Sequence, residues 1–217
     1  MKSRAYAFWH FMLCWLARLL FFIIPHGVKN EPRIKDGPYI VCSNHTSAVD
    51  PIIICACTRR QQPRFMAKAE LFKKPVLGKM ISGLGAYPVD RSGRDAGVLM
   101  RSIKMLEEGY CIGMFPQGTR RPGVDPETTP VRNGIGMICS HSRATVLPVF
   151  IKTRKNRVRP FSPVRVYVGR PVSWEEYTDG GRRDDSASVS RYVFSKICEL
   201  GGRKYPPVSE NNEDNQS

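Results

Sequence analysis

The chain has 217 residues, of which 41% are hydrophobic, and 34 Lys and Arg against 19 Asp and Glu give it a net charge of +15. This length suits one domain with a substantial core, or one domain plus an appendage, and the apolar content excludes a wholly disordered chain. The basic excess predicts an anionic partner, and charge alone leaves nucleic acid, an anionic membrane and phosphorylated substrates open.

An apolar stretch, residues 5–24, lies at the start of the chain. It is just long enough to span a membrane, but Arg18 near its middle would be costly in a spanning helix. His10 and Arg18 share one helical face, and aromatic and aliphatic side chains cover the rest. We therefore expect residues 1–27 to form a membrane-associated helix that lies in the bilayer surface, the alternative being a helix packed on the domain.

Strand and helix patterns alternate along the rest of the chain. The expected strands are residues 38–43, 63–71 (running into a turn), 86–91, 110–116, 144–153 and 164–172. The expected helices are residues 51–60, 73–85, 94–109, 131–143 and about 185–200. This alternation predicts an α/β fold, a single layered domain with a mixed, largely parallel central sheet flanked by helices. We place this domain at residues 28–202, and residues 203–217 have the composition of a disordered tail.

Two local features qualify this prediction. Pro148 lies inside the strand at 144–153 and indicates an edge strand or a special backbone site. The seven cysteines lie mostly in apolar runs, and no CxxC pair or nearby His completes a zinc set around Cys55 and Cys57. We expect buried, reduced thiols in a cytosol-facing protein, and no metal site.

The stretch CSNHTSAVDP, residues 42–51, places His45 and Asp50 between two apolar elements. On a helix, side chains at this spacing would point about 140° apart, but the residue before Pro51 is biased away from helical backbone. A compact loop could instead fold His45 back onto the carboxylate, which would fix the imidazole tautomer for general-base catalysis. The alternative is that Asp50 only caps the following helix and His45 is a surface residue.

Cations and glycines follow three of the expected strands. They are Lys68 after FMA, Arg91 in GAYPVDR, and Gly118, Thr119 and Arg120 in FPQGTR. A glycine permits close backbone approach, and an arginine can hold an anion bidentately. Each group alone also fits a strand-to-loop corner with a solvated cation.

The order of these motifs carries more information than any one of them. His-x4-Asp, Lys-x-Glu-Leu, Gly-x-x-Pro-Val-x-Arg, Phe-Pro-x-Gly-Thr-Arg and Val-Leu-Pro-Val follow one another between residue 38 and about residue 173. Together they resemble the glycerolipid acyltransferase family, specifically its bacterial 1-acylglycerol-3-phosphate acyltransferases. The resemblance implies transfer of a fatty acyl group from acyl-CoA or acyl carrier protein to the sn-2 hydroxyl of a lysophospholipid, giving phosphatidic acid without a covalent acyl-enzyme.

The resemblance also assigns roles to residues. His45 is implied as the general base and Asp50 as the group that orients it. Substrate binding is implied for Lys68, Arg91, Gly118, Thr119 and Arg120. No cofactor is implied beyond the acyl donor, and the expected location is the cytoplasmic face of the cell membrane, against its anionic surface.

One position departs from the family pattern, because Gln117 stands where the third motif usually has Glu. Glutamine keeps the size and hydrogen-bonding capacity but loses the charge. If that Glu orients Arg120, the neutral amide would hold the arginine less tightly. Our hypothesis is that Gln117 is tolerated.

Three other functions remain as alternatives. A relative with another acceptor, such as glycerol-3-phosphate or a lyso-aminolipid, would keep the same motifs. A basic nucleic-acid-binding protein is disfavoured, since Lys and Arg are not interleaved with aromatics except around RKNRVRPF, residues 154–161. An inactive membrane scaffold is disfavoured by the intact His45 and Asp50.

Overall fold

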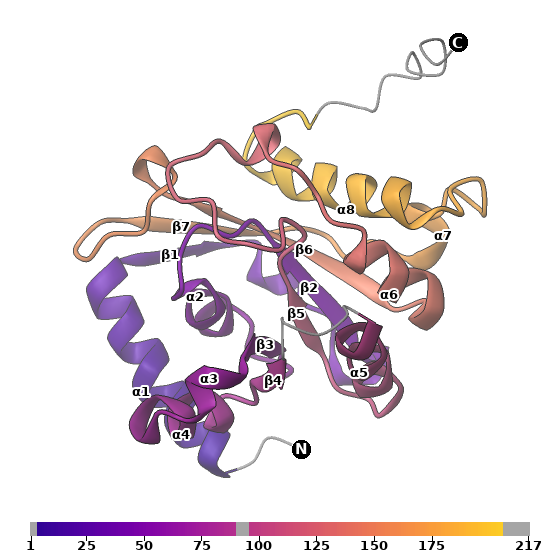
Figure 1. Ribbon diagram of the computed structural model, residues 1–217. Helices are drawn as coiled ribbons and strands as arrows, with labels where there is room; N and C mark the ends of the chain where they lie inside the picture. The colour runs from indigo at the N-terminus through magenta and orange to yellow at the C-terminus, as the bar shows by residue number, and fades with distance from the viewer. Residues whose placement is uncertain (1–3, 90–95, 206–217) are drawn as a thin grey trace.

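The computed structural model describes residues 4–89 and 96–205, and in them seven strands form one sheet in the order β1-β7-β6-β2-β5-β3-β4 (Figure 1). The strands are β1 (Ile23–His26), β2 (Tyr39–Ser43), β3 (Arg64–Lys68), β4 (Tyr87–Val89), β5 (Ile112–Met114), β6 (Thr145–Lys152) and β7 (Val164–Val168). The helices are α1 (Arg4–Phe21), α2 (Asp50–Cys57), α3 (Ala69–Phe72), α4 (Pro75–Gly83), α5 (Ala96–Glu107), α6 (Gly134–Ser142), α7 (Trp174–Tyr177) and α8 (Ser186–Leu200).

The sheet is mixed and mostly parallel. Neighbouring strands from β6 through β2, β5 and β3 to β4 run parallel, whereas β7 is antiparallel to β6 and carries β1 parallel to itself at the edge. The predicted α/β class and sheet are confirmed. In such sheets ligands bind beyond the carboxyl ends of the parallel strands, so the loops after β2, β3, β4, β5 and β6 share the edge of interest.

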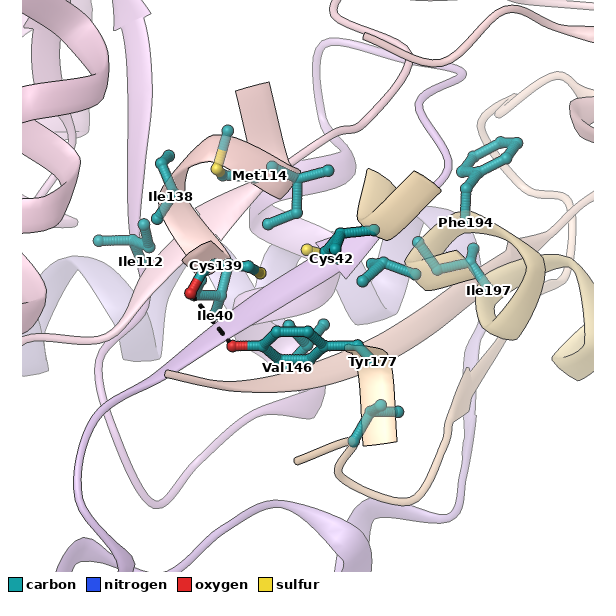
Figure 2. Close-up of a cluster of buried hydrophobic side chains, with 14 of the residues drawn as sticks. Ile40, Cys42, Ile112, Met114, Ile138, Cys139, Val146, Tyr177, Phe194 and Ile197 are labelled. Carbon is teal, nitrogen blue, oxygen red and sulfur yellow. Dashed lines mark hydrogen bonds between the residues drawn. The ribbon is translucent and has the colours of Figure 1, made fainter. Parts of the chain in front are cut away.

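Each face of the sheet is covered by helices, and the side chains of β2 alternate between two buried clusters. Ile40 and Cys42 pack with residues of α5, α6 and α8. Figure 2 shows part of this cluster, in which the Tyr177 hydroxyl donates a hydrogen bond to the carbonyl of Cys139 at 3.3 Å. Tyr39 and Val41 face the other cluster, with residues of α2 and α1. Fully apolar strands buried on both faces are typical of parallel sheets.

Pro148 does not mark an edge strand, because β6 lies between β7 and β2. Val146 exchanges two backbone hydrogen bonds with Val172, so alternate residues of β6 turn their N–H side toward β7. The ladder with β7 ends at Val168, opposite Val149. The missing N–H of Pro148 therefore falls where the partner strand is interrupted. Pro148 thus marks a special backbone site within the sheet and not an edge strand.

The expected helix in residues 5–24 is present as α1, and it packs on α2 with its polar face. Arg18 Nη2 donates to the carbonyl of Ala56 at 2.7 Å, and His10 Nε2 lies 2.9 Å from the carbonyl of Cys55. The opposite face is exposed and apolar, with Phe11 74% and Trp15 59% accessible. Among the described residues no helix has the length and hydropathy to cross a membrane.

The division of the chain into segments stays a prediction. Residues 23–26, inside the expected N-terminal segment, form β1 and pair with β7, an element that the sequence did not predict. Of the expected tail, residues 206–217 lie outside the described residues. The seven cysteines are all buried, as predicted, and burial raises the pKa of Cys14 to about 11 and of Cys57 to about 12.

Candidate active site

The loop between β2 and α2 leaves the sheet at Asn44. Its side chain is buried and pairs with the backbone of Ile151 in β6, donating from Nδ2 at 3.0 Å and accepting at Oδ1 at 2.8 Å. An amide side chain thus replaces the backbone pairing that would have continued the strand. This turn places His45 at the carboxyl edge of the parallel strands.

His45 and Asp50 meet in this loop. His45 Nδ1 lies 2.8 Å from Asp50 Oδ2, which also accepts hydrogen bonds from the amides of Thr46 at 2.6 Å and Ser47 at 2.7 Å. The Asp50 side chain is fully buried, and that of His45 is 15% exposed. The carboxylate of Asp50 can only accept, so in the neutral form of the imidazole it selects the tautomer with the proton on Nδ1 and the lone pair on Nε2. No hydrogen bond to Nε2 occurs within the described part of the chain.

Asp50 is the first residue of α2, not its N-cap as the sequence suggested. The N-cap position is Val49, and the Asp50 carboxylate turns back to the preceding loop instead of forward to the helix amides. A proline in the first turn costs no hydrogen bond there, so the helix can begin directly after the loop. The carboxylate is therefore committed to His45 and to the loop that carries it.

The segment after β5 holds the backbone of His45 from both sides. Gln117 Oε1 accepts from the His45 amide at 2.7 Å, and the Arg121 amide donates to the His45 carbonyl at 2.8 Å. The imidazole stacks on the ring of Phe115, with centroids 3.9 Å apart and planes inclined by 12°. With Asp50 at Nδ1, these contacts fix both the position and the orientation of the ring.

The hydrogen-bond partners of the Gln117 side chain are His45 and Thr129, and Arg120 is not among them. The Gln117 side chain is 2% exposed, and Nε2 donates to Thr129 Oγ1 at 2.7 Å. The Thr129 hydroxyl in turn donates to the carbonyl of Pro126 at 2.6 Å. The neutral amide of Gln117 thus accepts from the His45 amide through Oε1 and donates to Thr129 through Nε2, so the hydrogen bonds around it do not require a charge at residue 117.

The structure brings together only some of the predicted binding residues. Gly118 has φ of +68°, a backbone conformation that favours glycine. Its amide donates a hydrogen bond to the carbonyl of Phe115 and so closes a tight turn. Thr119 and Arg120 follow this turn and are exposed, and Arg120 lines a cavity of about 380 Å³ that is also lined by Thr46 and Ser47.

The other two predicted cations lie elsewhere. Lys68 is exposed at the end of β3, two strands away from β2, and does not line this cavity. Arg91 lies outside the described residues. Among the described residues, no group of three His, Cys, Asp or Glu side chains is arranged to hold a metal ion.

Sequence reasoning missed several residues around His45. Phe115 is the first residue of the predicted FPQGTR motif but was given no role, and Arg121 directly follows the motif; their contacts with His45 could not be read from spacing. Arg157 and Arg159 also line the cavity, from the loop between β6 and β7. The one available signal was the basic run at residues 154–161, which was considered only for nucleic-acid binding.

The α/β fold places the hydrogen-bonded His45–Asp50 pair at the carboxyl edge of the parallel strands, the edge at which enzymes with such sheets bind their ligands. The model of the family described as Acyltransferase matches residues 25–152, and the chain belongs to this family. This match, together with the named relatives described below, confirms the resemblance of the motifs to the 1-acylglycerol-3-phosphate acyltransferases, and the chain is an O-acyltransferase of that type.

Three known proteins show the extent of the similarity. The 1-acyl-sn-glycerol-3-phosphate acyltransferase of Bacillus subtilis is 26% identical over 179 residues, covering 80% of this chain and 88% of that protein. The enzyme of that name from Streptococcus pneumoniae is 30% identical over 125 residues, which are 57% of this chain and 45% of that protein. The crystal structure of the 1-acyl-sn-glycerophosphate (LPA) acyltransferase PlsC from Thermotoga maritima matches with a TM-score of 0.65 and 26% identity, covering 92% of this chain and 79% of that chain.

Proposed function

We propose that the protein transfers a fatty acyl group from a thioester donor, acyl-CoA or acyl carrier protein, to the sn-2 hydroxyl of 1-acylglycerol-3-phosphate. His45 Nε2 takes the hydroxyl proton as the oxygen attacks the thioester carbonyl carbon. The carbon–sulfur bond then breaks, and the thiolate leaves with the proton returned from His45. The products are phosphatidic acid and the free thiol, with no cofactor beyond the donor.

The hydrogen bond of 2.8 Å between His45 Nδ1 and the buried Asp50 carboxylate carries this proposal. A carboxylate at Nδ1 favours the tautomer whose Nε2 can accept a proton, and it stabilises the imidazolium that results. The backbone contacts from Gln117 and Arg121 hold the ring in place before substrate arrives, so little reorganisation is needed in the transition state. Acceptor identity is supported by the names of the relatives and by the cationic cavity that adjoins the loop carrying His45.

We place the enzyme on the cytoplasmic face of the cell membrane, held there by the outer face of α1. The exposed apolar side chains of this face are Phe8, Phe11, Met12, Trp15, Leu16 and Leu19. The amide of Phe161, whose side chain is 71% exposed, donates to the carbonyl of Leu20 and so joins the basic β6–β7 loop to the end of α1. An apolar face beside a basic loop suits the surface of an anionic bilayer.

The experiment is a product assay on the purified full chain in mixed micelles, with acceptors crossed against donors. The acceptors are 1-acylglycerol-3-phosphate, glycerol-3-phosphate and a lyso-aminolipid, each with acyl-CoA and with acyl carrier protein. We expect phosphatidic acid from the first acceptor at the highest kcat/KM. A higher kcat/KM for either other acceptor would contradict the proposed acceptor while leaving acyl transfer intact.

A further inference from the structure

A cationic cavity lies beside the catalytic loop, and two of its arginines belong to none of the recognised motifs. It has a volume of about 380 Å³ and is lined by Thr46 and Ser47 on one side and by Arg120, Arg157 and Arg159 on the other. Thr46 and Ser47 directly follow His45 in the chain, so the cavity adjoins the loop that carries the base, although His45 itself is not among its lining residues. Its position corresponds to the edge where the loops after β2, β5 and β6 meet.

The loop that carries Arg157 and Arg159 is joined by hydrogen bonds to the loop that holds His45. The Gly123 amide donates to the carbonyl of Asn156 at 2.9 Å, and Asn156 Nδ2 donates to Asp125 Oδ1 at 2.7 Å. The guanidinium of Arg157 lies against Gly123, where a Cβ atom would meet Arg157 Nε at 2.7 Å. These contacts place Arg157, and the loop that carries Arg159, relative to the segment that binds the backbone of His45.

The positive charge in this cavity is not neutralised by the protein. Among the described residues, no carboxylate forms an ion pair with Arg120, Arg157 or Arg159. The nearby Asp125 is paired with Arg203 at 2.9 Å. Three guanidiniums around one cavity suit a dianionic phosphate monoester, which each can bind through charge-assisted hydrogen bonds.

Covalent distance decides which substrate phosphate belongs there. In the acceptor only two carbons and one ester oxygen separate the reacting hydroxyl oxygen from phosphorus. In the donor the whole pantetheine arm separates the thioester from the nearest phosphate. With the hydroxyl at His45, the acceptor phosphate must lie close to the loop that carries His45, which this cavity adjoins, and the donor phosphates must lie much farther away.

We infer that Arg157 and Arg159, together with Arg120, form the subsite for the phosphate of the acceptor. This inference rests on the proposed function and adds to it two binding residues from outside the motifs. The β6–β7 loop also touches the end of α1, so the subsite lies beside the surface expected to face the lipid. An acceptor could then keep its acyl chain toward the bilayer and its phosphate against the arginines.

The test compares the full-length parent with Arg157→Gln, Arg159→Gln and the double variant. Arg154→Gln, exposed in the same loop but absent from the cavity lining, is the matched control. We expect KM for 1-acylglycerol-3-phosphate to rise about tenfold for each cavity arginine replaced, as for a lost charge-assisted hydrogen bond. The KM for the donor, the rate with phosphate-free 1-acylglycerol and the kinetics of the control should stay within about twofold of the parent.

Two results would overturn the subsite. One is an unchanged acceptor KM in the double variant, and the other is a rise confined to the donor KM, which would assign the arginines to the donor phosphates. A parent that does not acylate 1-acylglycerol-3-phosphate would instead contradict the proposed function. In that case titration with glycerol-3-phosphate, followed by calorimetry, still decides the subsite, because equal binding by parent and double variant excludes it.

Discussion

Replacing Gln117 with Glu restores the residue usual in the family, and the structure predicts that this harms the enzyme. Gln117 Oε1 accepts from the His45 amide, and a carboxylate oxygen could do the same. The other carboxylate oxygen would face Thr129 Oγ1, where Nε2 now donates. The Thr129 hydroxyl would have to leave the carbonyl of Pro126 to donate to the new charge.

The cost follows from this count of hydrogen bonds. The Pro126 carbonyl would lose one of its two hydrogen-bond donors, keeping the Thr129 amide at 3.0 Å, and the new charge is placed at a position that is 2% exposed. A lost hydrogen bond costs about 0.5–1.5 kcal/mol, and burial of the charge adds to this cost. For a chain of this length each kcal/mol lowers Tm by about 2–4 °C, so the lost hydrogen bond alone should lower Tm by about 1–6 °C.

The assay pairs thermal unfolding, followed by circular dichroism, with steady-state turnover. We expect a lower Tm and a kcat no higher than that of the parent. Gln117→Met, which removes both hydrogen bonds without adding charge, serves as the comparison and should also lower kcat by loosening the His45 backbone. A Glu variant that is as stable as the parent and at least about tenfold faster would refute the hydrogen-bond argument and show that the natural glutamine impairs the enzyme.

Three further outcomes are expected. Asp50→Asn, which would place an amide donor against His45 Nδ1, should lower kcat by about 10³–10⁴-fold with little change in KM, as measured by steady-state kinetics. The native cysteines should react slowly with a thiol reagent at pH 8 and fully only in denaturant, and rapid labelling of the native protein would contradict their burial. Cys111 should react faster as pH rises, because burial raises the pKa of its thiol to about 12. Phe11→Ser combined with Trp15→Ser should weaken sedimentation with anionic vesicles by at least about tenfold, whereas Met100→Ser, exposed on α5, should not.

Point substitutions test the membrane surface better than deletion of residues 1–27. Such a deletion would remove β1 from its pairing with β7 and would uncover the face of α2 that α1 now covers. Loss of activity after deletion could then reflect unfolding. The exposed side chains of α1 can be changed without touching either contact.

The fold was largely predictable because its strands are short, apolar and separated by helices with clear periodicity. β1 was not predictable in this way. Its residues read as the end of the preceding apolar stretch, and its strand identity depends on pairing with β7, which is far away in the sequence. Pro148 likewise could be read as an edge signal because the break in β7 opposite it is a feature of the partner strand.

At the site, sequence predicted the elements of the His45–Asp50 loop but not its supports. The bias of a residue before proline indicated that Asp50 would leave regular helix and allow the loop to close, although Asp50 proved to be the first residue of α2. The contact of Gln117 with Thr129 depends on how the segment after β5 folds back, which spacing does not encode. Arg157 reaches the cavity through contacts with Gly123, so its role is equally invisible in the sequence.

The most direct test of the whole account is acyl transfer by a purified His45→Ala variant with 1-acylglycerol-3-phosphate and its best donor. The account predicts that kcat falls by at least about 10²–10⁴-fold, the contribution of a positioned general base, while the fold and the acceptor affinity measured by titration are retained. Phosphatidic acid formed at the parental rate would contradict it.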